Sequence, residues 1–121
     1  IVGRPVASLL INNNCTVTVI HSKSINVKQE ISNADIIVIA IGSANFLKSE
    51  YVKDKAIIID VGINKLNDKL TGDVDFADFK NRDVYITPVP GGVGPMTIAC
   101  LFENTLKAAC YIKHIDFESI N

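Results

Sequence analysis

Two nearly uninterrupted apolar runs stand out in a chain whose other segments mix apolar and polar positions. Residues 36–41 read IIVIAI and residues 56–61 read AIIIDV, and a glycine, Gly42 or Gly62, follows each run. Short runs of this kind are typical of strands in a parallel sheet that is covered on both faces. The pattern therefore predicts two central parallel strands, each ending in a glycine turn.

The remaining pattern predicts further strands and a series of helices. Residues 15–20 alternate and are rich in β-branched side chains, and residues 84–86 are apolar and aromatic, which favours strands. From Met96 to about Lys113 apolar residues recur at helical spacing, so we predict the longest helix there. Shorter elements are expected as helices at residues 1–11, 26–32, 48–52 and 75–79, a turn at Asn67-Asp68 and a strand at residues 70–74.

Strands that alternate with helices predict an α/β fold, a Rossmann-type, doubly wound and mainly parallel sheet with helices on both faces. A length of 121 residues is ordinary for one domain. The chain opens at Ile1-Val2-Gly3 with a helix and no strand before it. Because a dinucleotide-binding fold opens with a strand and a glycine turn, we expect this chain to lack the first strand. A natural start at Ile1 is the alternative.

Composition and charge argue against several classes of function. The net charge is −1 at pH 7 and no basic stripe is visible, which does not suit a nucleic-acid partner. No apolar run reaches the length of a membrane span, so we expect no membrane partner. The cysteines, Cys15, Cys100 and Cys110, form no metal-ligand pair and leave one thiol over in any disulfide scheme. We therefore expect no metal site and a cytoplasmic protein.

Candidate cofactor positions lie at the ends of the expected elements. Val2 and Gly3 open the first helix, where backbone N–H groups can hold a pyrophosphate. The next strand ends at His21, Ser22 and Lys23, near the usual place of the ribose-reading residue. An acidic residue there would favour NAD. Ser22 can instead donate a hydrogen bond to a 2′-phosphate beside the cationic Lys23, so NADP is favoured and NAD stays possible.

Further candidate positions follow the two apolar runs. In open α/β sheets, ligands bind outside the carboxyl ends of the strands. Ile41 and Gly42 follow the first run and Ile63 follows the second, and small residues at these ends leave room for a cofactor. Asp60 and Asp73 have no acid–base partner at short spacing, so we expect them to serve in turns and caps.

The most specific feature is the loop PVPGGVGPMT at residues 88–97. Its glycines allow the backbone to pass close to a ligand, and its prolines restrict the loop's conformations. Pro95 suits the first turn of the following helix, where free N–H groups can receive a polar or anionic ligand group. Considered alone, such a loop is also compatible with a rigid connection between strand and helix.

This loop resembles the signature of the bifunctional methylenetetrahydrofolate dehydrogenase/methenyltetrahydrofolate cyclohydrolase family. The similarity runs in order from Ile1 to about Ala109 and includes IVGRP at 1–5, TVTV at 16–19, HSK at 21–23, DVGIN at 60–64 and GDVDF at 72–76. The resemblance implies that residues 1–121 are the C-terminal, Rossmann-type NAD(P)-binding domain of a two-domain, homodimeric enzyme.

The resemblance also implies an activity and residue roles. Members of the family oxidise 5,10-methylenetetrahydrofolate with NADP, or NAD in some members, and hydrolyse the methenyl product to 10-formyltetrahydrofolate. Ser22 would face the adenosine ribose or its 2′-phosphate, and Gly42 and Ile63 would line the dinucleotide cleft. Thr97 would sit on the nicotinamide side of a folate-facing wall formed by Pro90, Gly91, Gly92, Val93 and Gly94.

Two parts of the family pattern are absent from this sequence. The Gly-Arg-Ser turn that contacts the phosphates is missing, and so is the N-terminal domain with the catalytic Tyr-x-x-x-Lys. We therefore expect no catalytic residue in this chain and no activity of the 121 residues alone. The alternatives are the Rossmann domain of another NAD(P)-dependent dehydrogenase and a stand-alone nucleotide-binding module.

Overall fold

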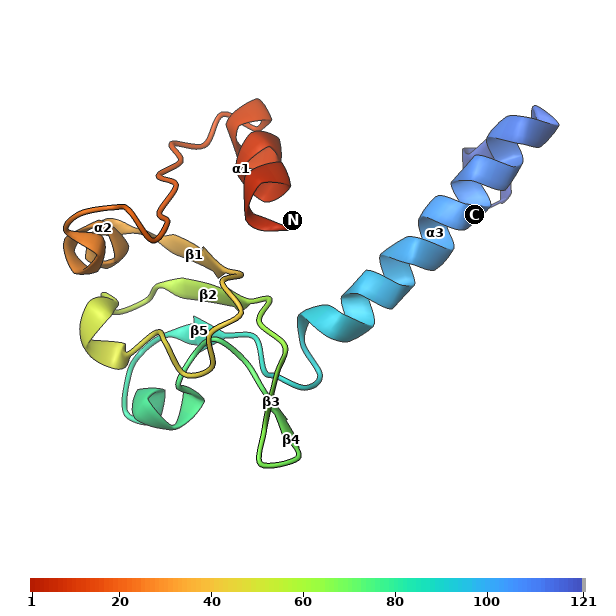
Figure 1. Ribbon diagram of the computed structural model, residues 1–121. Coiled ribbons are helices and arrows are strands. Elements are labelled where there is room, and N and C mark those ends of the chain that lie inside the picture. Colours follow the sequence, from red (N-terminus) through yellow and green to blue (C-terminus); the bar gives the residue numbers. More distant parts are fainter. Residues whose placement is uncertain (121) are drawn as a thin grey trace.

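The computed structural model describes residues 1–120 and arranges helices around a small parallel sheet (Figure 1). The α-helices are α1 (Gly3–Asn12), α2 (Val27–Asn33) and α3 (Val93–Lys113). The strands are β1 (Ile36–Ile39), β2 (Ile57–Asp60), β3 (Asn64–Leu66), β4 (Lys69–Thr71) and β5 (Tyr85–Ile86). The 3-10 helices are η1 (Ser49–Tyr51), η2 (Phe76–Phe79) and η3 (Phe117–Ile120).

Strands β1, β2 and β5 form a parallel sheet in the order β1-β2-β5. Ile36 pairs with Ile57, and Ile58 pairs with Ile86, so the two apolar runs are neighbours and the last strand lies beside the second. This arrangement confirms the predicted Rossmann-type α/β fold class. Because all three strands point the same way, their carboxyl ends lie at one edge of the sheet.

The hydrophobic core lies against one face of this sheet. Its buried apolar side chains come from the sheet, from α2 and from the segments that follow β1 and β2, and they are Ile31, Ile39, Leu47, Val52, Ala56, Ile58, Val74 and Phe79. Ile36 and Ile57 are 52% and 42% exposed. Burial on both faces of the two runs is therefore wrong for these positions. By strand alternation Ile36 and Ile57 point to the face opposite to the core residues Ile39 and Ile58.

The strand predicted at residues 15–20 does not form. Among residues 1–120, this segment joins no β-ladder, and it connects α1 to α2 as irregular chain (Figure 1). The N–H of Cys15 donates to the carbonyl of Leu10 at 3.0 Å, and Val19 stays 55% exposed. Alternating, β-branched side chains suit a strand, but the backbone of a strand also needs a neighbouring backbone to pair with. In this structure the segment does not run beside β1, so the ladder is missing.

Strands β3 and β4 form an antiparallel hairpin around the predicted turn. Asn67 and Asp68 have φ angles of +48° and +62°, as the two central residues of a tight hairpin turn require. The turn prediction is confirmed, whereas β3 was not predicted. The strand predicted at residues 70–74 is shorter, because β4 ends at Thr71 and Val74 instead forms an isolated parallel bridge with Leu47.

The two short helices predicted after β1 and β2 are single 3-10 turns, η1 and η2. Hydrogen bonds that involve side chains join one turn to the other. Asp75 does not cap η2 but accepts a hydrogen bond from Nζ of Lys48 at 2.5 Å, which raises the pKa of Lys48. Asp78 accepts the N–H of Ser49 at 2.7 Å, and this bond lowers the pKa of the Asp78 carboxyl.

Helix α3 begins at Val93, ahead of the predicted start at Met96, and extends away from the sheet (Figure 1). Its apolar side chains are largely exposed, for example Phe102 at 73% and Ile112 at 71%. Near its end η3 folds back on it, and an apolar pocket of about 590 Å³ lies there between Phe102 and Phe117. In the part of the chain that the structure describes, no helix is long and apolar enough to span a membrane.

Candidate functional site

The carboxyl ends of β1, β2 and β5 meet at one edge, which we call the strand-end edge. It comprises residues 40–42 after β1, residues 61–64 after β2 and residues 87–92 after β5. The N–H of Val61 donates to the carbonyl of Ile39 at 2.9 Å, and the N–H of Asp60 donates to Oγ1 of Thr87 at 2.9 Å. The folding of the sheet thus brings together three predicted segments that are far apart in the sequence.

A buried carboxylate joins two of these segments. Asp73 is 0% exposed, and its Oδ2 accepts the N–H groups of Ile41 at 2.7 Å and Gly42 at 2.9 Å. Its Oδ1 accepts Nδ2 of Asn64 at 2.8 Å. The residue therefore ties the segment after β1 to the segment after β2.

A second buried carboxylate holds the first one in place. Asp60 is 3% exposed, and its Oδ1 accepts the N–H of Gly62 at 2.9 Å and the N–H of Asp73 at 3.0 Å. Its Oδ2 accepts the N–H of Val74 at 3.0 Å. A buried carboxylate is tolerated when donors surround it, and here backbone N–H groups fill that role.

The two glycines beside these carboxylates are required by space. A Cβ placed on Gly62 would lie 2.3 Å from Cγ of Asp73, and one placed on Gly72 would lie 1.8 Å from Oδ2 of Asp60. Our expectation of separate turn and cap roles for Asp60 and Asp73 missed this pairing. The signal in the sequence was that each aspartate stands next to or near a glycine, in DVG and GDV.

The outer side of the strand-end edge is open and apolar. Ile41 is 52% exposed and Ile63 is 67% exposed. Gly42 has φ +69°, and a Cβ there would meet nothing within 4 Å. This conformation favours glycine, and the surface beside it has room for a ligand.

The glycine-rich loop leads from β5 to α3. The Val89–Pro90 peptide bond is cis, and Gly91 has φ +105°. A Cβ on Gly92 would lie 2.5 Å from the carbonyl oxygen of Pro88, whereas Gly94 has open space around that position. Gly92 is thus needed for the loop's own packing, while Gly91 and Gly94 leave its outer surface free.

Thr97 and Pro95 stand at the beginning of α3. Pro95 is the third helical residue, within the first turn as predicted. The hydroxyl of Thr97 donates to the carbonyl of Val93 at 3.0 Å, and the residue is exposed. Pro90, Gly91, Gly92, Val93 and Gly94 therefore lead directly into the turn that carries Thr97.

The first predicted site residues stand at the start of α1. Val2 is the N-cap residue, and the first turn contains no acidic side chain that would repel an anion. A Cβ on Gly3 would meet nothing within 4 Å. In Figure 1 this first turn lies on the side of the sheet at which β1 and β2 end.

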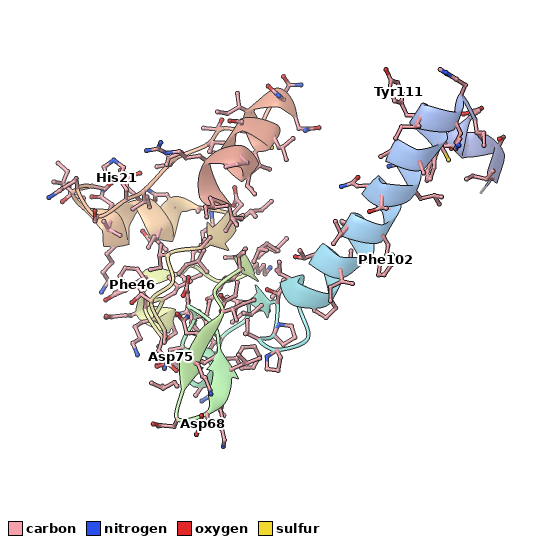
Figure 2. The ribbon with its side chains drawn as sticks, turned by 45° about the vertical axis from the view of Figure 1, so that its right-hand side comes forward. His21, Phe46, Asp68, Asp75, Phe102 and Tyr111 are labelled. Carbon is pink, nitrogen blue, oxygen red and sulfur yellow. The ribbon has the colours of Figure 1, made fainter. Side chains whose placement is uncertain are left out.

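His21 and Ser22 lie on an exposed turn before α2, and Figure 2 shows His21 at the periphery of the molecule. The N–H of Lys23 donates to Nδ1 of His21 at 3.1 Å, and the N–H of His21 donates to Oγ of Ser24 at 3.0 Å. Within residues 1–120, the hydrogen bonds of this turn stay inside it, so they do not join it to the strand-end edge.

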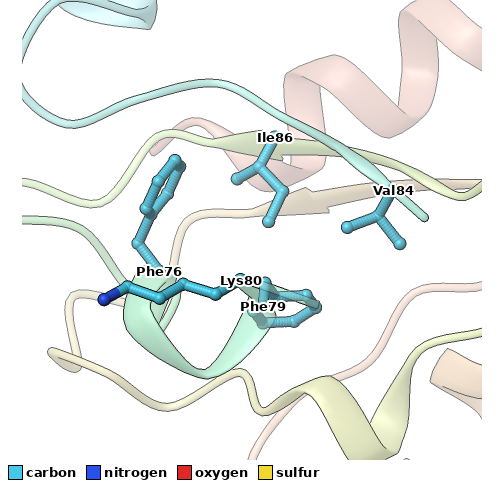
Figure 3. A pocket seen from close by; sticks show the side chains of 5 residues that line it. All are labelled: Phe76, Phe79, Lys80, Val84 and Ile86. Carbon is cyan, nitrogen blue, oxygen red and sulfur yellow. The ribbon is translucent and has the colours of Figure 1, made fainter. Parts of the chain in front are cut away.

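The pocket in Figure 3 lies elsewhere in the fold. It has a volume of about 290 Å³ and is lined by Phe76, Phe79, Lys80, Val84 and Ile86. None of these is a predicted site residue. Among the described residues, no group of three or more His, Cys, Asp or Glu side chains is placed to hold a metal ion.

Comparison with known proteins gives matches over most of the chain. The family model for the tetrahydrofolate dehydrogenase/cyclohydrolase NAD(P)-binding domain matches residues 1–113. The chain is 60% identical over 110 residues to the bifunctional protein FolD of Campylobacter hominis, a match that covers 90% of this chain and 39% of that relative.

Solved structures agree with this match. The bifunctional 5,10-methylenetetrahydrofolate dehydrogenase/cyclohydrolase of Thermoplasma acidophilum superposes with a TM-score of 0.87 at 45% identity, over 93% of this chain and 41% of that chain. The Trypanosoma brucei N5,N10-methylenetetrahydrofolate dehydrogenase-cyclohydrolase, solved with NADP cofactor and an inhibitor, gives 0.79 at 42% identity, over 86% and 38%.

The chain thus spans 39% of the length of the Campylobacter hominis relative, while the family model covers nearly all of the chain itself. The same segments that carry the family match form the strand-end edge and the glycine-rich loop. The chain belongs to the tetrahydrofolate dehydrogenase/cyclohydrolase family and corresponds to its NAD(P)-binding domain.

Proposed function

We propose that this chain is the cofactor-binding domain of an enzyme that oxidises 5,10-methylenetetrahydrofolate to 5,10-methenyltetrahydrofolate with NADP and hydrolyses the product to 10-formyltetrahydrofolate. The family match over residues 1–113 carries the proposal, and the related Trypanosoma brucei enzyme was solved with NADP. A separate N-terminal domain would supply the catalytic lysine. The tetrahydrofolate substrate would bind between the two domains.

The strand-end edge fits a dinucleotide. Exposed apolar side chains of Ile41 and Ile63 flank Gly42, where no atom fills the space that a Cβ would occupy. We assign these three residues to the cofactor cleft. The bound nicotinamide supplies the hydride acceptor, and the residues of the chain hold and orient it.

The phosphates and the ribose would be bound outside this edge. We assign the pyrophosphate to Val2 and Gly3, because a helix start without acidic side chains attracts anions. We assign the adenosine ribose and its 2′-phosphate to His21 and Ser22, whose turn is exposed.

The folate-facing wall would be the glycine-rich loop, formed by Pro90, Gly91, Gly92, Val93 and Gly94. Gly91 and Gly94 have no atom within 4 Å of a Cβ position, so a planar ring can approach the backbone closely. Thr97 follows one helical turn after Val93 and would face the nicotinamide side of this wall.

A chimera tests the proposal. In the Campylobacter hominis relative, the matched 110 residues are replaced by the corresponding residues of this chain. We expect the chimera to reduce NADP when 5,10-methylenetetrahydrofolate is added, with the unmodified relative as the control. A chimera that folds like the relative but neither binds nor reduces NADP would contradict the proposal.

Cofactor choice has its own test in the same chimera. Ser22→Asp places a negative charge beside the proposed 2′-phosphate position, so we expect the preference for NADP over NAD to fall by about tenfold. Ser22→Ala is the matched control and should change it less. An unchanged preference in Ser22→Asp would remove Ser22 from the site.

We also propose a cytoplasmic homodimer. The free thiols Cys15, Cys100 and Cys110 suit a reducing compartment. The unpaired segment at residues 15–20 offers backbone groups to a second subunit. Light scattering of the chimera and fractionation of the host cell would test the two statements, and a monomer or a secreted protein would refute them.

A further inference from the structure

We propose that Asp73 is a positioning residue for the cofactor. Through its bonds to Ile41, Gly42 and Asn64, it sets the surface that Ile41, Gly42 and Ile63 present at the strand-end edge. The inference rests on the proposed function, because it assumes that the cofactor lies at this edge. It goes further by giving a role to a residue that is fully buried and cannot touch the cofactor itself.

The hydrogen bonds of Asp73 reach two different loops. Its Oδ2 accepts hydrogen bonds from two successive N–H groups, those of Ile41 and Gly42, at 2.7 and 2.9 Å. Its Oδ1 receives Nδ2 of Asn64 at 2.8 Å. One carboxylate therefore sets the spacing between the loop after β1 and the loop after β2.

The loops that Asp73 joins carry the exposed side chains of the proposed cleft. Ile41 is 52% exposed although its N–H points inward to a buried oxygen, and Ile63 directly precedes Asn64. The N–H groups of Ile41 and Gly42 both donate to Asp73 and are not free to bind the cofactor. Ile41 would therefore contact the cofactor through its side chain, and Gly42 through its Cα. The chain turns at Gly42, just after these two N–H groups, in a left-handed conformation of φ +69° that favours glycine.

Asp60 makes this arrangement rigid. It accepts the N–H groups of both Asp73 and Gly62, so the backbone of Asp73 and the turn after β2 share one anchor. Gly62 also packs directly against the Asp73 carboxylate, with no room for a Cβ. The carboxylate is therefore fixed from both sides, as a group that positions others must be.

The chimera described above provides the test. Asp73→Asn offers only one oxygen where two are needed, so we expect the KM for NADP to rise by about tenfold. The KM for 5,10-methylenetetrahydrofolate should change by less than about twofold, since the folate wall belongs to another loop. Asp68→Asn is the matched control, because the side chain of Asp68 is 93% exposed in the hairpin turn.

A paired exchange separates positioning from plain structural support. In the double variant Asp73→Asn/Asn64→Asp, the aspartate at position 64 can only accept hydrogen bonds, so Nδ2 of the asparagine at position 73 donates to it. Oδ1 of that asparagine is then oriented to accept the N–H groups of Ile41 and Gly42. We expect the KM for NADP to return to within about threefold of the unsubstituted chimera. A folded exchange variant whose KM for NADP stays as high as in Asp73→Asn would overturn the proposal.

Two further results keep the test decisive. If Asp73→Asn alone does not fold, the exchange variant is judged directly against the unsubstituted chimera by the same two KM values, and an equal rise in both overturns the proposal. In the 121-residue chain, NMR hydrogen exchange should show slow exchange of the Ile41 and Gly42 amides despite their exposed residues. Fast exchange of both amides would also overturn it.

The outcomes separate the two proposals. An unsubstituted chimera that does not use NADP contradicts the proposed function. An active chimera in which Asp73→Asn leaves the KM for NADP unchanged contradicts only the role of Asp73.

Discussion

Replacing Gly72 by alanine tests the packing of the two buried aspartates. The φ angle of Gly72 is not in the left-handed region, so alanine is not excluded by backbone conformation. A Cβ at this position would lie 1.8 Å from Oδ2 of Asp60, far inside van der Waals contact. The cost of the substitution therefore comes from the movement of one carboxylate.

The size of the effect follows from what that carboxylate holds. Oδ2 of Asp60 accepts the N–H of Val74 at 3.0 Å, and Asp60 is only 3% exposed, so water does not replace a lost bond. Overpacking costs about 1–3 kcal/mol. A broken hydrogen bond to a buried charged group costs about 1.5–3 kcal/mol. We expect Gly72→Ala to lower the free energy of unfolding by about 2.5–6 kcal/mol.

Urea unfolding of the chain, followed by far-UV circular dichroism, measures this change. The matched control is Gly3→Ala in helix α1, where a Cβ meets nothing within 4 Å. It should not lower the free energy of unfolding and should raise it by at most about 1 kcal/mol. Combining Gly72→Ala with Asp60→Ala removes the clashing atoms, so the two losses should not add. A loss below about 1 kcal/mol for Gly72→Ala, or full additivity, would refute the packing argument.

Two further predictions concern the 3-10 turns. Arg82 donates to the carbonyl groups of Ser49 and Val52 at 2.8 and 2.7 Å. Arg82→Lys keeps the charge but loses this geometry, so it should lower the free energy of unfolding by about 1–3 kcal/mol. An unchanged urea midpoint would argue against this role of Arg82. The N–H of Ser49 lowers the pKa of Asp78 from 3.8, so this carboxylate stabilises the fold above its ordinary pKa and loses that effect as the pH falls through the lowered value. Carbon-detected NMR titration of Asp78 should give a pKa below 3.8, and a value at or above it would contradict the hydrogen bond.

Local patterns were sufficient for much of the fold. The two apolar runs became adjacent parallel strands, the Asn67-Asp68 pair became a tight turn, and Pro95 stands in the first turn of α3. These features depend on side-chain period and on backbone preferences over a few neighbouring residues. The family resemblance, carried by short motifs in order, came from the sequence as well.

The tertiary structure decided what depends on distant partners. The alternating residues 15–20 form no ladder, because a strand needs a neighbouring backbone that its own side chains do not specify. Asp73 lies 32 positions from Ile41 and 13 from Asp60, and only the folding of β1 and β2 side by side brings the three together. Local propensity extends over a few residues, whereas the donors of a buried carboxylate are set by the packing of the whole sheet, so the candidate site's framework emerged only in three dimensions.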